Sequence, residues 1–157
     1  MAMANEHEFP QSLLGNPFGV VGIFKPGPPQ FDPMKILRIH GYKNMEKIRP
    51  VIRKTAAEIA ERAAGVMTPV IHFKRMAVAE CSGEGLRLEN GLAFTNPAFI
   101  RYLYEAREVV TVVITVGKGL DDEVIDFMDR FEPLEALFME TAGWLGIEWT
   151  TKKFVEF

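Results

Sequence analysis

The sequence predicts a mixed α/β domain over residues 34–157, preceded by an extended arm over residues 1–33. The chain has 157 residues, of which 48% are hydrophobic, which is enough for one core of ordinary size. Apolar residues alternate or run together in short stretches such as 109–115, a pattern typical of strands. Elsewhere they recur every three or four residues, as in 48–63 and 120–131, a pattern typical of amphipathic helices.

Composition narrows the class of protein. The 18 Lys and Arg residues against 21 Asp and Glu residues leave a net charge of −3, so we expect no nucleic-acid partner. Cys81 is the only cysteine, which favours a reducing compartment. No apolar run approaches the roughly 20 residues that a membrane helix needs. The first residues lack a basic segment followed by an apolar one, as a secretory signal would have. We therefore expect a cytoplasmic protein without a membrane partner.

The N-terminal arm combines several prolines with many apolar residues. Four prolines lie in "FKPGPPQFDP", which excludes a helix or a central strand there. We expect the arm to pack against the body or against a second copy in a homo-oligomer, with "FGVVGIF" as an edge strand. Its apolar residues are Phe9, Leu13, Leu14, Phe18, Val20, Val21, Ile23 and Phe24.

The first elements of the body are read from periodicity and capping residues. Residues 34–42 alternate and predict a short strand. Asn44 can cap a helix over the following apolar-periodic stretch. Pro50 lies inside that stretch, so the helix either begins near Pro50 or kinks there, and Gly65 is a plausible stop.

The remaining elements follow in the same way. Residues 68–80 predict a strand, and Asn90-Gly91 predicts a hairpin turn within 85–94. Thr95 or Asn96 can cap a helix that has Pro97 at its first position. Strand 109–115 follows, then helices over 120–131 and from Pro133 through 149.

A glycine pair follows the apolar strand in "VVTVVITVGKGLDDEV". A dinucleotide fingerprint needs Gly-x-Gly-x-x-Gly, but Asp122 occupies the third position after Gly117 and Gly119. Asp121 and Asp122 suit the positive end of a helix dipole, and they would repel a phosphate there by about 1 to 4 kcal/mol. We interpret the stretch as a tight strand-to-helix turn, and not as a phosphate site.

Few other residues indicate chemistry. The three histidines, His7, His40 and His72, have neither helical-pair spacing nor accompanying cysteines, so we expect no metal site. Glu140 lies in an apolar helical segment with two glycines, so it has a partner or belongs to a surface that binds a ligand. The aromatic C-terminus, which includes Trp144, is expected to dock on the chain's own core or on a second subunit.

The segment "EAREVVTVVITVGKGLDDEVIDFMDRFEPLEALFMETAGWLGIE" (105–148) resembles the activation domain of cobalamin-dependent methionine synthase and its small stand-alone relatives. "LRIHGY" and the Pro-centred "TPVIHF" are similar to two earlier segments of that family, so the resemblance covers roughly residues 34–150. The residues that carry it are Arg38, Gly41, Tyr42, Thr115, Val116, Gly117, Leu120, Met139, Glu140, Thr141, Ala142, Gly143 and Glu148.

The resemblance implies an α+β fold in which a curved, mainly antiparallel sheet packs with helices. In the full enzymes this domain binds S-adenosylmethionine, which remethylates cob(II)alamin. The Arg-x-x-x-Gly-Tyr segment that binds it there has no counterpart up to Phe157. S-adenosylmethionine is thus a candidate ligand without transferable binding residues, and a corrinoid is expected only through a partner.

Three functions remain open at this stage. The first is an accessory protein that docks to a corrinoid protein or methyltransferase, or assists its reactivation. The second is a small-molecule-binding protein or enzyme with Thr115, Gly117, Gly119 and Glu140 at the site. The third is a homo-oligomeric structural protein. Whether the chain is an enzyme stays open as well.

Overall fold

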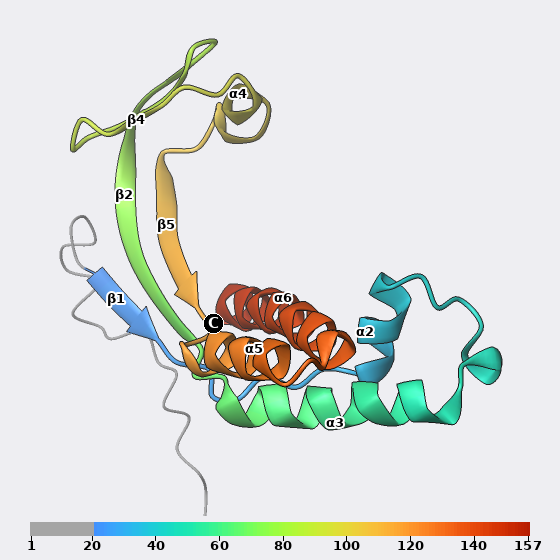
Figure 1. Ribbon diagram of the computed structural model, residues 1–157. Coiled ribbons are helices and arrows are strands. Elements are labelled where there is room, and N and C mark those ends of the chain that lie inside the picture. The colour runs from blue at the N-terminus through green and yellow to red at the C-terminus, as the bar shows by residue number, and fades with distance from the viewer. Residues whose placement is uncertain (1–20) are drawn as a thin grey trace, which may run out of the picture. The chain divides into compact units, whose positions relative to one another are not determined.

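The computed structural model describes residues 21–157, and it has an α+β fold with a mostly antiparallel sheet (Figure 1). Most of the expected N-terminal arm, residues 1–20, lies outside the described residues. The elements in chain order are β1 (Val21–Phe24), α2 (Pro33–Ile39), a 3₁₀ turn (Met45–Lys47), α3 (Pro50–Val66), β2 (Val70–Ser82), β3 (Gly85–Leu88), β4 (Ala93–Phe94), α4 (Ala98–Leu103), β5 (Glu108–Thr115), α5 (Gly119–Asp129) and α6 (Pro133–Glu156).

The described chain forms two compact units. One comprises residues up to Ile23 together with His72–Val113, and the other comprises Phe24–Ile71 together with Ile114–Phe157. The first contains most of the sheet, and the second contains α2, α3, α5 and α6. The predicted division into an arm and one domain at residue 34 stays a prediction.

The sheet is built around β2. Its strands run in the order β1-β2-β3-β4, and β5 also pairs with β2. The predicted hairpin is confirmed: β3 and β4 are antiparallel, with Leu86 opposite Phe94, and Gly91 in the connecting turn has a φ of +84°. The predicted edge strand is confirmed for Val21–Phe24, at one end of the strand order.

The strand predicted over residues 34–42 is wrong, because the segment is helix α2. Pro33 occupies the first turn, and the Asp32 carboxylate caps the helix by accepting a hydrogen bond from the Met34 N–H at 2.9 Å. Ile36 and Leu37 are consecutive and both fully buried, which the alternating faces of a half-exposed strand do not allow. The alternation of apolar and polar residues was too short to distinguish a strand from a short helix, in which only Ile36 and Leu37 are buried.

The capping residues predicted most helix starts correctly. Pro50 begins α3, which decides the alternative between a start and a kink, while Asn44 caps the 3₁₀ turn before it. Asn96 accepts a hydrogen bond from the first residue of α4, and Pro133 begins α6. These starts agree with rules that depend on neighbouring residues alone.

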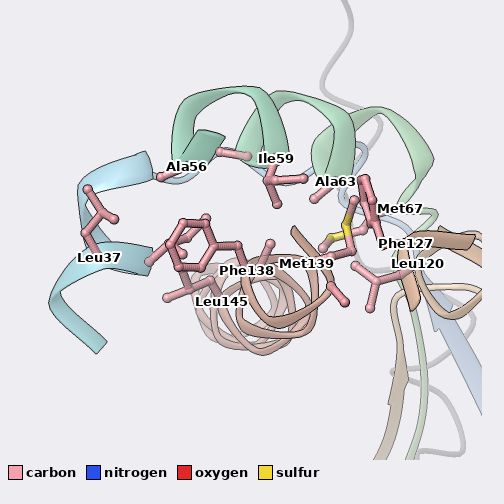
Figure 2. Packing of buried hydrophobic residues seen from close by; sticks show 14 of the residues in the cluster. Leu37, Ala56, Ile59, Ala63, Met67, Leu120, Phe127, Phe138, Met139 and Leu145 are labelled. Atoms are coloured by element: carbon pink, nitrogen blue, oxygen red, sulfur yellow. The ribbon is translucent and has the colours of Figure 1, made fainter. Parts of the chain in front are cut away.

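The core of the helical unit is centred on α6. This helix packs against α5 and α3 (Figure 1), and its buried residues Phe138 and Met139 face Ile59 and Ala63 of α3 (Figure 2). Leu120 and Phe127 of α5 belong to the same core. One long side of α6 is therefore buried against other helices, whereas Trp144 on another side is exposed.

Candidate functional site

The turn from β5 to α5 uses both of its glycines for packing. Gly117 has a φ of +89°, and a Cβ placed there would lie 2.2 Å from Thr68 Oγ1. A Cβ at Gly119 would lie 2.9 Å from the carbonyl oxygen of Val66. The turn is held by the Gly117 N–H, which donates to Thr115 Oγ1 at 3.1 Å. Close approach to the chain segment after α3 thus explains the glycine pair without a ligand.

The charges at this turn are paired within the helix start. Lys118 Nζ donates a hydrogen bond to Asp122 Oδ1 at 2.6 Å. That hydrogen bond, followed by the charges of Asp122 and Asp121, raises the pKa of Lys118. The ammonium that an anionic ligand would need is therefore already bound to a carboxylate. This geometry favours the interpretation as an acidic strand-to-helix turn.

A groove lies beside this turn, between α5 and α6. It has a volume of about 450 Å³, and its walls are mainly apolar. Leu120 and Gly143 are buried, while Trp144 and Ile125 are exposed along it. The lining residues are Val116, Leu120, Asp121, Val124, Ile125, Glu140, Gly143, Trp144 and Ile147.

Gly143 lets α5 and α6 approach closely beside the groove. A Cβ at Gly143 would lie 2.6 Å from Leu120 Cδ2, so the two helices approach closely because a side chain is missing. Glu140, Trp144 and Ile147 follow at helical spacing and share that face of α6. The groove is therefore lined by one face of α6 at a point where α5 packs closely against it.

Large apolar side chains are exposed along the groove. Trp144 is 79% exposed and Ile125 is 58% exposed. Met128, which lies one turn after Val124 and does not line the groove, is 57% exposed. Contiguous exposed apolar surface on a folded protein is typical of an interaction site, because it forgoes the free energy of burial.

Two carboxylates border this apolar surface. Asp121 and Glu140 are exposed groove residues, and within residues 21–157 neither side chain has a hydrogen bond or an ion pair. Glu148, by contrast, accepts a hydrogen bond from Lys152 Nζ at 2.6 Å, which lowers the pKa of Glu148. The groove therefore combines an apolar floor, an exposed indole and two carboxylates, of which Asp121 also interacts with the charge of Lys118. This combination suits a ligand that is apolar and positively charged.

Of the four predicted ligand-binding residues, only one lines the groove. Glu140 lines the groove, whereas Thr115, Gly117 and Gly119 form the turn beside it and are not lining residues. Trp144 was expected to dock on the chain's own core or on a second subunit. The structure exposes it on the groove, which overturns the first alternative, and the second stays a prediction. The spacing of four residues between Glu140 and Trp144 was the sequence signal that could have indicated a shared face.

The other candidate side chains have local roles. His40 and Thr141 are hydrogen bonded to each other. His72 is exposed on β2, and Cys81 packs half-buried against a small apolar cluster of the sheet unit. In the part of the chain that the structure describes, no three His, Cys, Asp or Glu side chains are grouped to hold a metal ion.

No protein-family model matches the chain, and no curated protein matches it either. Among residues 21–157, no helix has both the length and the apolar character needed to cross a membrane.

Proposed function

We propose that this chain is a non-catalytic accessory protein of a corrinoid-dependent methyl-transfer system. It docks to a corrinoid protein or its methyltransferase, or assists reactivation of that protein. Two features support the proposal: the resemblance of residues 105–148 to the methionine synthase activation domain, and the location of the groove. The proposal includes the more specific fold of that family.

The single observation that carries the proposal is that the groove lies within the segment that resembles the family. Every residue that lines the α5–α6 groove falls between Val116 and Ile147, inside the resembling segment. The groove is open and apolar, with an exposed indole at Trp144. Exposed aromatic residues are enriched where proteins bind one another. Docking through the segment that carries the resemblance is therefore the function that best fits this surface.

An affinity purification from the native cell tests the proposal. The full chain, tagged at one end, should retain a protein whose bound corrinoid is recognised by its visible absorbance and which binds again when purified. The Trp144→Ala variant should retain less of it. Asp126→Asn, on an exposed position of α5 outside the groove, is the matched control. Absence of any corrinoid protein among the retained proteins would contradict the proposal.

A second candidate function is binding of a small molecule, favoured by the size of the groove. A volume of about 450 Å³ lies within the roughly 300–1,000 Å³ of ordinary ligand sites, and Glu140 borders it. Isothermal titration with S-adenosylmethionine, S-adenosylhomocysteine and cobalamin tests this function. Saturable binding that Glu140→Gln abolishes would favour it, whereas binding unchanged by Glu140→Gln would place the ligand elsewhere.

A further inference from the structure

We propose that the α5–α6 groove receives one amphipathic helix of a partner protein, with Lys or Arg residues flanking the apolar stripe of that helix. The inference rests on the proposed docking function and names the kind of segment that docks. Three features support it: the exposed face of the α5–α6 pair, the length of the apolar surface on that face, and the carboxylates of Asp121 and Glu140 beside it.

Within the helical unit, the helices that contact the α5–α6 pair pack on one side of it. α3 packs against both α5 and α6, and α6 also contacts α2. Phe138 and Met139, on the covered side of α6, are fully buried, whereas Trp144 is exposed. Two packed helices with one bare apolar face leave a groove into which a third helix fits by ordinary ridge-and-groove packing.

The apolar surface continues beyond the groove itself. Met128 follows Val124 by one turn on α5, and Leu137 precedes Glu140 by about one turn on α6; both side chains are exposed. Together with Ile125 they extend the apolar strip along the helix axes. A strip of several turns matches the anchors that a helix presents at positions i, i+3, i+4 and i+7, and it is longer than a small ligand needs.

The charge of the groove selects the partner. Asp121 and Glu140 border the apolar floor, and neither carboxylate is paired within the described part of the chain. Lys or Arg residues beside the partner's apolar stripe would supply the opposite charges. A second copy of this chain, docked about a two-fold axis, would instead bring two Asp121 and two Glu140 carboxylates to one interface, where they repel.

Trp144 is the expected anchor of this interface. Its indole is large, rigid and solvent-exposed, so binding would bury much apolar area at a low cost in side-chain entropy. Its face can also receive an ammonium or guanidinium group. The Trp144→Ala variant should therefore weaken binding of any helix that uses the groove, whatever the charges of that helix.

Two designed peptides test the inference. Both are helices of about four turns with the same leucine stripe, and the flanking residues are lysine in one and glutamate in the other. Each carries a fluorescent label and is titrated with the full chain while its anisotropy is recorded. We expect the lysine peptide to bind at least about tenfold more tightly than the glutamate peptide, with a difference that shrinks as salt rises.

Two double variants test whether the difference in affinity between the two peptides arises at the groove. Asp121→Asn with Glu140→Gln should abolish most of the preference for lysine. Asp126→Asn with Asp129→Asn removes the same charge from exposed positions of α5 that do not line the groove, and it should preserve the preference. Equal loss in both double variants would overturn the inference, because the lysine peptide would then respond only to net charge.

Other occupants give different outcomes, and each overturns the inference. Equal affinity for the two peptides, or none for either, excludes a basic amphipathic helix. Self-association of the chain alone, abolished by Trp144→Ala in sedimentation, would assign the groove to a second copy. Saturable binding of S-adenosylmethionine that Glu140→Gln abolishes, together with no binding of the lysine peptide, would assign the groove to a small molecule.

The inference and the proposed function can fail separately. Retention of a corrinoid protein that is unaffected by Trp144→Ala or by excess lysine peptide would leave the function standing and overturn the helix inference. Groove-dependent binding of the lysine peptide without retention of any corrinoid protein would support the helix inference and contradict the function.

Discussion

The His40 Nε2 atom lies 2.7 Å from the Thr141 hydroxyl, although 101 positions separate the two residues. Thr141 Oγ1 also lies 3.0 Å from the Leu137 carbonyl oxygen, to which it can donate its one hydrogen. Both contacts are then satisfied when His40 carries its proton on Nε2 and donates it to Thr141. Thr141 is buried on α6, and the hydrogen bond joins the end of α2 to that helix. The Thr141 hydroxyl therefore predicts the Nε2–H tautomer for His40.

The Thr141→Val variant should therefore be less stable than the wild type. Valine preserves the shape but leaves the His40 N–H without its acceptor, which costs about 1–2 kcal/mol. Urea denaturation measures the change, and Thr141→Ser, which retains the hydroxyl, should lose less. A valine variant as stable as the wild type would mean that the hydrogen bond contributes nothing to stability. Nitrogen NMR of the imidazole should show the Nε2–H tautomer.

Gly117→Ala should destabilise the turn before α5. A side chain at a φ of +89° costs about 1–2 kcal/mol, in addition to the contact with Thr68 Oγ1. Gly65→Ala is the matched control, because Gly65 lies in α3 with nothing near its Cβ position. Denaturation should show a loss for the first variant and no loss for the second, since alanine favours helix. A neutral Gly117→Ala would contradict the strained geometry.

The Arg62–Glu123 ion pair should contribute more stability than an exposed pair. Arg62 Nη2 lies 2.5 Å from Glu123 Oε2, and the Glu123 side chain is only 17% exposed. The Arg62 guanidinium carbon lies over the Phe127 ring, 5.0 Å from its centroid. Arg62→Ala should cost about 1–3 kcal/mol, because it leaves a shielded carboxylate unpaired and uncovers the ring. Lys54→Ala, which removes the exposed pair with Glu58, should cost at most about 0.5 kcal/mol. Equal losses would contradict this ranking.

The pKa of Glu148 should respond to Lys152. The hydrogen bond from Lys152, and then its charge, hold the pKa of Glu148 below the ordinary value. The stabilisation is present above the unfolded-state pKa and is lost as the pH falls through the lowered folded pKa. In Lys152→Met, a carboxyl-carbon NMR titration should show the Glu148 pKa moving up toward its ordinary value. No movement would mean that the pair does not form in solution.

Trp144→Ala should leave the fold intact. Because the indole is 79% exposed, its removal should change the free energy of unfolding by less than about 0.5 kcal/mol. Thermal unfolding followed by circular dichroism measures this, and a loss of binding can then be assigned to the surface. A large loss of stability would instead mean that Trp144 packs within the fold.

Sequence alone predicted the features that depend on neighbouring residues. Proline at the first turn located the start of α6, and it gave a start at Pro50 as one of two alternatives for α3. Asn90-Gly91 located a hairpin, and the acidic residues after Gly119 argued against a phosphate site. Capping, turn conformation and the helix dipole act within a few residues, so they can be recognised without a fold.

The tertiary structure decided what depends on distant segments. Residues 34–42 alternate like a strand, and only their packing in the helical core shows why Ile36 and Leu37 are both buried. Sequence selected Glu140 but not the indole beside it, because periodicity defines the faces of α6 without saying which one the fold covers. That choice is made by the packing of α6 against α3 and α5, which buries Phe138 and leaves Trp144 in solvent.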